Sequence, residues 1–141
     1  MDKALNYMAL ARKAGRIELG EEPVGAAARA VKAWLVVVAS DASDHTWRRA
    51  KSFVAGTNQQ CIRAPFTKDE MGFVIGRTSL AIAAFTDAAM ALAFVKALSG
   101  DYSEVQAVLQ ERTDRIRKRQ SEEKAHQRNK RVGKPHRSVK K

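Results

Sequence analysis

The residues closest to a catalytic or metal-binding pattern lie between positions 41 and 45. Asp41, Asp44 and His45 directly follow a run of apolar residues, so the end of a strand would bring two carboxylates and an imidazole near one another. Such a group could transfer protons or hold a cation. The alternative, which we prefer, is that these short polar residues cap the helix expected after them.

Other residue patterns give little indication of catalysis. Glu21 and Glu22 are adjacent, and neighbouring helical residues diverge by about 100°, so their carboxylates do not converge on one atom. The sequence has no phosphate-loop or dinucleotide glycine pattern and no nucleophile motif. One cysteine, Cys61, and three scattered histidines give no zinc pattern, and we expect Cys61 to be a small buried residue. The sequence therefore predicts neither an enzyme nor a cofactor.

The positive charge is concentrated at the end of the chain. Residues 112–141 contain 13 Lys or Arg and 3 acidic residues, whereas residues 1–111 contain 13 basic and 12 acidic ones. A polycationic segment attracts polyanions and gives affinity without selectivity. This distribution favours a nucleic-acid ligand, with selectivity residing in the near-neutral part.

Composition also bears on location. The longest apolar runs, 33–39 and 88–95, are far shorter than the ~18 residues that cross a bilayer. The first residues do not form a signal peptide, and a single cysteine suits a reducing compartment. We expect a cytoplasmic monomer with no membrane partner.

Helical and strand patterns alternate along the first hundred residues. The expected helices span 2–14, 21–32, 43–55, 67–75 and 87–98. The expected strands span 17–19, 34–39, 60–64 and 80–85. This order predicts an α/β fold, a three-layer α/β/α sandwich with a mixed sheet of about four strands, over residues 1–100.

Residues 101–141 are expected to form a basic extension. A helix should begin near residue 103, dock near residue 105 and project from the domain. Apolar residues almost vanish after Ile116, so we expect a disordered tail from about residue 126.

Basic residues near a glycine break form the best candidate surface. Arg12, Lys13 and Arg16 come just before Gly20, and the helix after Gly20 would present unpaired backbone N–H groups that suit a phosphate or a base edge. The loops 40–44 and 76–79 could lie at the same edge. Other cations and aromatic residues are expected at the surface or in the core: Arg48, Arg49 and Lys51 as solvated surface, Trp34 in the core or at the sheet edge, and Trp47 in the core or as a stacking platform.

Several stretches resemble one protein family. They are 11–16, 19–22 and 35–43, followed by 67–76 and 81–87. Together they resemble the ribosomal L-seven-Ae / L-thirty-e family over residues 3 to about 98, and among its members the small bacterial YlxQ-like proteins. The resemblance implies an α/β/α sandwich that binds structured RNA, typically kink-turns, without catalysis.

The resemblance also implies which residues contact RNA. It implies RNA contacts by Lys13, Arg16, Gly20, Glu21, Glu22, Gly76, Arg77, Thr78, Ser79 and Leu80, and we add the basic residues Arg12 and Lys32 to the expected RNA-binding residues of the domain. The tail lies outside the resemblance; its expected phosphate contacts are Arg112, Arg115, Lys118 and Arg119.

One part of the family motif is different here. Kink-turn readers carry Gly-x-Asn-Glu-x-x-Lys at this helix start, and this chain has Glu22, Pro23 and Ala26 at the last three specified positions. A carboxylate replaces an amide that both donates and accepts, and the phosphate-seeking lysine is lost. The alternatives are weaker kink-turn binding, a different RNA, or greater reliance on the tail.

The expected partner is therefore structured RNA, ribosomal or ribosome-associated, with the ribosome or translation factors as further partners. Three alternatives remain open at this stage. The chain could be a protein-interaction or assembly module, a nonspecific nucleic-acid binder, or an RNA-binding accessory to a separate methyltransferase.

Overall fold

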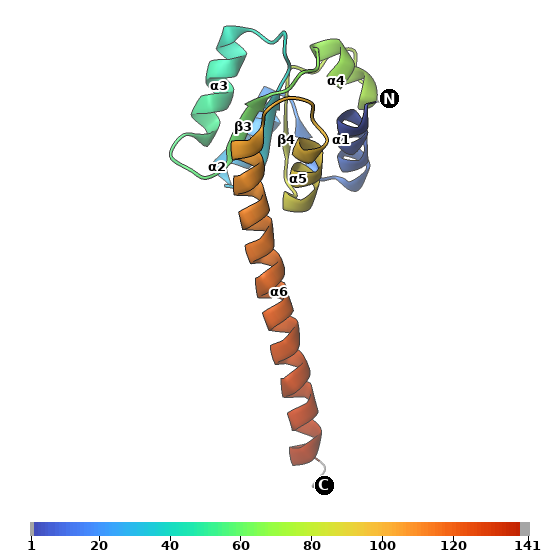
Figure 1. Cartoon of the computed structure of the whole chain (residues 1–141), viewed down its shortest axis with the longest axis vertical. Coiled ribbons are helices and arrows are strands. Elements are labelled where there is room, and N and C mark those ends of the chain that lie inside the picture. Colours follow the sequence, from blue (N-terminus) through green and yellow to red (C-terminus); the bar gives the residue numbers. More distant parts are fainter. Residues whose placement is uncertain (1, 139–141) are drawn as a thin grey trace.

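The computed structural model describes the backbone of residues 2–138 and the side chains of residues 2–128. It consists of an α/β body from which one long helix projects (Figure 1). Helices and strands alternate: α1 (Lys3–Ala14), β1 (Ile17–Leu19), α2 (Glu21–Arg29), β2 (Leu35–Val38), α3 (Asp44–Val54), β3 (Gln60–Arg63), α4 (Lys68–Val74), β4 (Ile82–Phe85), α5 (Ala88–Lys96) and α6 (Ser103–Ser138). Each predicted element is present, with ends shifted by at most a few residues.

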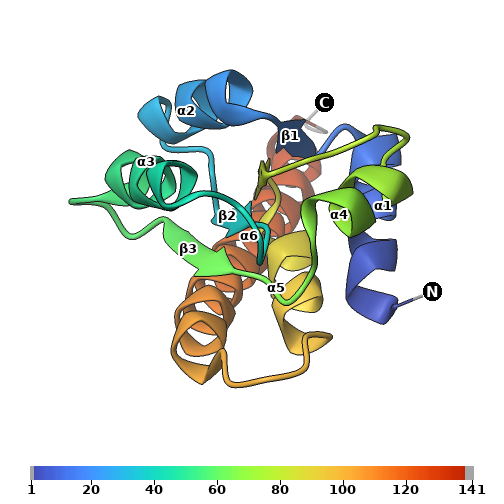
Figure 2. The same ribbon diagram turned by 90° about the horizontal axis from the view of Figure 1, so that it is seen from above.

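The four strands form one mixed sheet in the order β1-β4-β2-β3. β2 and β3 are parallel, and β4 is antiparallel to both β1 and β2. Helices α1, α5 and the start of α6 cover one face, while α2 and α3 cover the other (Figure 2). The predicted three-layer α/β/α sandwich with a mixed sheet is confirmed.

Local sequence signals explain why these elements form where they do. The central strands β2 and β4 are buried along their whole length, as expected for continuous apolar runs between helix layers. Helix α1 buries its apolar stripe and begins at Asp2, whose carboxylate accepts the backbone N–H of Ala4 at 2.8 Å. Thr67 and Glu70 form the predicted capping box of α4.

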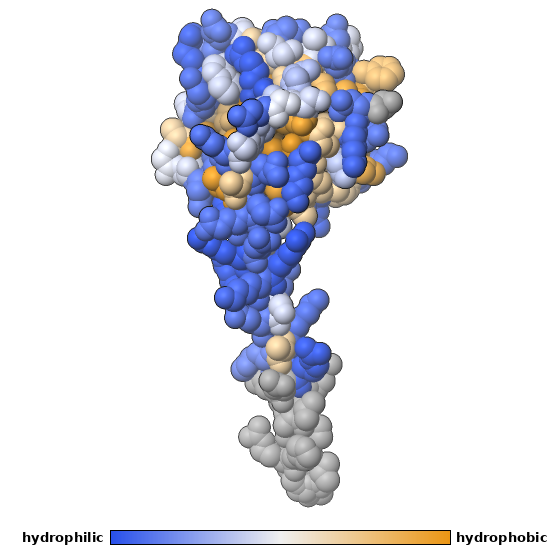
Figure 3. All heavy atoms as spheres, viewed as in Figure 1, coloured by the Kyte–Doolittle hydropathy of each residue, from blue (hydrophilic) through white to orange (hydrophobic). Residues whose placement is uncertain are grey.

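Helix α6 docks with its first turns and then leaves the body. Leu109 is fully buried against the core, and Val105 packs beside it. Farther along, the helix surface is mostly hydrophilic (Figure 3). The structure describes α6 as one helix to Ser138, and the disordered end expected from about residue 126 stays a prediction. The side chains after Arg128 lie outside the description, and their contacts with phosphate stay a prediction.

Candidate nucleic-acid interface

The sheet has two ends that carry different residues. At one end Gly20 N donates to Ile82 O at 3.0 Å and Ala39 N donates to Ala81 O at 2.9 Å. We call this end the rim; it includes the start of α2, the start of α4 and the loop 76–80. At the opposite end Thr86 N donates to Arg16 O at 2.9 Å. We call this end the root, because α6 leaves the body there.

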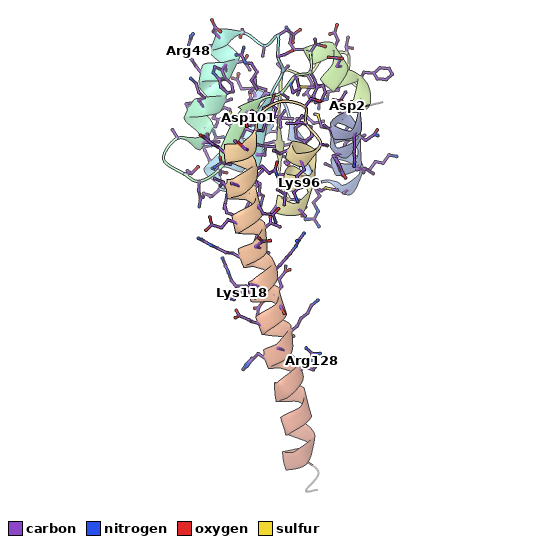
Figure 4. All side chains as sticks on the ribbon, in the orientation of Figure 1. Asp2, Arg48, Lys96, Asp101, Lys118 and Arg128 are labelled. Atoms are coloured by element: carbon purple, nitrogen blue, oxygen red, sulfur yellow. The ribbon has the colours of Figure 1, made fainter. Side chains whose placement is uncertain are left out.

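The predicted RNA-binding residues divide between these two ends. Gly20, Glu21, Glu22 and the loop 76–80 lie at the rim, whereas Arg12, Lys13, Arg16 and Lys32 lie at the root. The three residues of β1 separate Arg16 from Gly20, and the four residue steps of extended chain span about 13 Å. The expectation that the first-helix cations lie beside Gly20 is therefore wrong. In Figure 4, Asp2 and Arg48 lie away from the projecting part of α6, which carries Lys118 and Arg128.

The rim exposes the start of a helix without concentrating positive charge. Gly20 has φ +96° and caps α2 with no side-chain hydrogen bond, a conformation that favours glycine. The carboxylate of Glu21 pairs with the guanidinium of Arg49 at 3.2 Å, so Arg49 is not purely solvated. The acidic residues of the rim are Glu21, Glu22, Asp41, Asp44, Asp69 and Glu70, and they outnumber the cations Lys68 and Arg77. The rim is therefore the less cationic end of the body.

The loop 76–80 is held by a close approach to α4. A Cβ added to Gly72 would lie 2.7 Å from Ser79 N and 2.9 Å from Arg77 O, so only glycine lets the loop pack here. Gly76, Arg77, Thr78 and Ser79 are exposed, as the prediction requires. Leu80 is 3% exposed, so its predicted RNA contact is wrong for the side chain, which packs in the core. Gly72 was missed, although a glycine inside a predicted helix often marks such packing.

Two residues of the polar group at 41–45 cap helices. Asp41 Oδ1 accepts the backbone N–H of Lys68 at 2.8 Å and so caps α4, rather than the helix that follows Asp41 in sequence. Ser43 caps that following helix, α3, by accepting the N–H of Thr46. Within the described residues no group of three or more His, Cys, Asp or Glu side chains could hold a metal ion.

At the root, part of the tail is packed against the body. The guanidinium of Arg112 lies 4.0 Å from the centre of the Trp34 ring, and its Nη1 donates to Asn58 O at 2.9 Å. Burial lowers the pKa of Arg112, and the charge of Arg115 lowers it further. Arg112 is thus a docking residue, and its predicted role as a tail phosphate contact is corrected. Arg115 pairs with Glu111 on its own helix.

Two further predicted tail contacts, Lys118 and Arg119, stay predictions. Lys118 and Arg119 are exposed on the part of α6 that projects from the root, and neither forms an ion pair with a described residue. Together with Arg12, Lys13, Arg16 and Lys32 they make the root the more cationic end of the body. The sequence could not reveal this grouping, because the residues come from two separate helices and two loops.

Trp47 and Cys61, the aromatic and thiol residues near β3, are both partly buried by neighbouring side chains. Trp47 is half-buried, with Arg63 at 5.1 Å and Lys51 at 5.4 Å from the ring centre. Cys61 is half-buried, and burial raises the pKa of its thiol to about 12, an effect that the positive charge of Lys51 partly opposes. Cys61 is accordingly a packing residue, not a reactive thiol.

No helix of the described chain is long and apolar enough to cross a membrane. No protein-family model and no curated protein sequence matches the chain.

Two solved structures are similar to this one. A protein of unknown function from Bacillus halodurans is 23% identical, with a TM-score of 0.64 over 69% of this chain and 97% of that chain. The Giardia lamblia 15.5kD RNA binding protein is 17% identical, with a TM-score of 0.52 over 74% of this chain and 85% of that chain. These likenesses show that the chain shares its fold with both proteins.

Proposed function

We propose that this chain is a non-catalytic RNA-binding protein of the ribosomal L-seven-Ae / L-thirty-e type. The observation that carries the proposal is that exposed cations of α1, of the loop before β2 and of α6 all lie at the root end of the sheet. Phosphate neutralisation by such a group supplies most of the affinity for RNA. The shared fold with a protein described as RNA binding supports the same function.

The two ends of the sheet have different roles in this proposal. The root and α6 hold phosphates and give affinity for any RNA. The rim, with the start of α2 and the exposed loop 76–79, selects among RNA shapes through backbone N–H groups and small polar side chains. Because Glu22, Pro23 and Ala26 replace the kink-turn motif, the favoured ligand is another structured RNA, ribosomal or ribosome-associated, in the cytoplasm.

Fluorescence anisotropy with the full chain tests this division. The ligands are a kink-turn RNA, an RNA hairpin without a kink-turn, and duplex DNA. Replacing Lys13, Arg16 and Lys32 by Gln should weaken binding to every ligand and reduce the salt slope by about two to three units. The matched control replaces Lys3, Arg48 and Lys96, which are exposed cations outside the root, by Gln. Equal losses in both triple variants would contradict a specific role for the root.

One feature favours a second candidate function, a protein-interaction module. Phe73 is 76% exposed at a pocket of about 450 Å³ between α1 and α4, next to Asp2, Asp69 and Glu70. An apolar side chain with an acidic surround suits a basic peptide that carries an apolar residue. If removing residues 121–141 abolishes RNA binding at about 200 mM salt while a basic peptide still binds, this function is the better one.

A further inference from the structure

A small pocket with a mixed polar and apolar wall lies at the root, where α6 passes the start of α5. Its volume is about 270 Å³, and its wall includes Trp34, Thr86, Asp87, Thr113, Ile116 and Gln120. We call it the root pocket. Pockets for drug-sized ligands measure about 300 to 1,000 Å³, so this one suits a smaller planar group.

Thr113 is the first indication that the root pocket is made for a ligand. Its side chain is 3% exposed, yet its hydroxyl Oγ1 has no hydrogen-bond partner among the described residues. A threonine on a helix commonly satisfies its hydroxyl at the carbonyl four residues earlier, and Thr113 does not. An unpaired buried hydroxyl costs roughly 1–3 kcal/mol, and a polar ligand in the pocket would remove that cost.

Asp87 determines which chemistry fits. One oxygen, Oδ2, accepts the backbone N–H of Met90 at 2.9 Å and caps α5. Asp87 forms no ion pair with the described residues, so its carboxylate retains capacity to accept further hydrogen bonds. A phosphate in this pocket would be repelled by that carboxylate, whereas a neutral group with N–H donors would be attracted.

The rest of the wall matches a nucleobase. The part of the Trp34 ring that the Arg112 guanidinium does not cover and Ile116 supply apolar surface, while Thr86, Thr113 and Gln120 supply polar atoms. Unstacked RNA bases are commonly bound by such a combination of an aromatic ring and hydrogen bonds to the base edge. Guanine presents two adjacent N–H donors on its Watson–Crick edge, which one carboxylate can accept together.

The surroundings favour a base that belongs to a polyanion. Thr86 N donates to the carbonyl of Arg16, and Arg117 lines the pocket. Cations around the pocket would hold the backbone phosphates while the base enters. We infer that the root pocket binds an unpaired guanine base. A free guanine nucleotide carries the same base, so the statement that the guanine belongs to an RNA rests on the proposed function.

NMR of the ¹⁵N-labelled full chain tests the inference with GMP, AMP, UMP and inorganic phosphate as probes. GMP should shift the Trp34 indole and the Ala88 and Ala89 amide signals more than the other three probes do. Asp87→Asn keeps an N-cap acceptor but loses the carboxylate, and it should weaken GMP binding about tenfold. Thr113→Val should weaken it about fivefold, whereas Thr113→Ser should retain it.

A second arm separates the two sources of guanine. Hairpin RNAs that differ only in one unpaired loop base, guanine or adenine, should bind the wild-type chain with different affinities and the Asp87→Asn chain with equal ones. Equal binding of all probes, stronger shifts with phosphate, or unchanged GMP binding in Asp87→Asn would overturn the inference. If hairpins bind equally while GMP still binds, the pocket takes free nucleotide instead. If the wild-type chain binds GMP but no RNA, the proposed function fails and the pocket stands.

Discussion

The guanidinium of Arg112 stacks on the ring of Trp34 at 4.0 Å, which fixes α6 to the start of β2. The same guanidinium donates to Asn58 O, in the turn before β3. These contacts, with the buried Leu109 beside them, make the first turns of α6 part of the body. Packing of these first turns therefore fixes the direction in which the rest of α6 projects.

The first prediction concerns this attachment. Arg112→Ala removes a stacking contact and a hydrogen bond, so the free energy of unfolding should fall by about 1–3 kcal/mol. Lys118→Ala removes one exposed cation from the same helix and should change it by less than about 0.5 kcal/mol. Urea unfolding measures both, and similar values for the two variants would show that Arg112 does not dock α6.

The second prediction separates the tail from the body in RNA binding. A chain ending at Gln120 keeps Arg112, Thr113 and Ile116 in place but loses eight Lys or Arg residues. If these neutralise about five phosphates, the slope of log K against log salt should lose about four to five units. The order of preference among RNA ligands should be retained. An unchanged slope would exclude the tail as a phosphate anchor.

The third prediction concerns the loop 76–80. Gly72→Ala forces a Cβ within 2.7 Å of Ser79 N, so the loop must shift and stability should fall by about 1–3 kcal/mol. Relative affinities for different RNAs should change while the salt slope stays the same. Gly56→Ala is the control. Gly56 has a φ of +76°, so alanine is strained there, but the added Cβ meets no atom within 4 Å and displaces no loop. A variant with unchanged RNA preference would place selection outside this loop.

The fourth prediction concerns Thr113 in the absence of any ligand. Thr113→Val removes an unpaired buried hydroxyl at constant shape, so the free energy of unfolding should rise by about 1 kcal/mol. Together with weaker GMP binding, such a gain would mark Thr113 as a residue that lowers stability for function. Thermal unfolding of the two chains measures the difference, and a destabilised valine variant would mean that the hydroxyl is satisfied.

The fifth prediction uses the raised pKa of Cys61. The unfolded thiol has a pKa of 9.0 and the folded one of about 12, so the folded state holds its proton more tightly. The resulting stability is complete below pH 9.0 and declines as the pH rises toward 12, by up to about 1.4 kcal/mol per pH unit. Cys61→Val lacks this decline. The difference between the two unfolding curves across that window is the measurement, and parallel curves would contradict burial of the thiol.

The sequence predicted the elements well, because their signals are local. The capping box of Thr67 and Glu70, the apolar runs of β2 and β4, and the alternation of helices and strands are all visible within short windows. The layered α/β/α arrangement follows from that alternation, whereas the antiparallel pairing of β4 does not. Leu80 was misassigned, because a position beside a polar loop does not reveal which way its side chain packs.

The spatial relations of the candidate site could not be predicted in the same way. Arg16 and Gly20 are close in sequence, but the extended chain of β1 carries them to opposite ends of the sheet. Conversely, Trp34 and Arg112 are far apart in sequence and in contact. These distances between residues depend on strand order and helix docking, which the local patterns of one sequence do not reveal.

The length of α6 sets a minimum size for a ligand that uses all of this surface. At about 1.5 Å per residue, Arg128 lies about 18 Å beyond Ile116 along the helix axis. An oligonucleotide shorter than this contacts either the body or the projecting part of α6. A longer one engages both, and the second contact then forms at a high effective concentration. Affinity should therefore rise in a step, not gradually, as the ligand is lengthened.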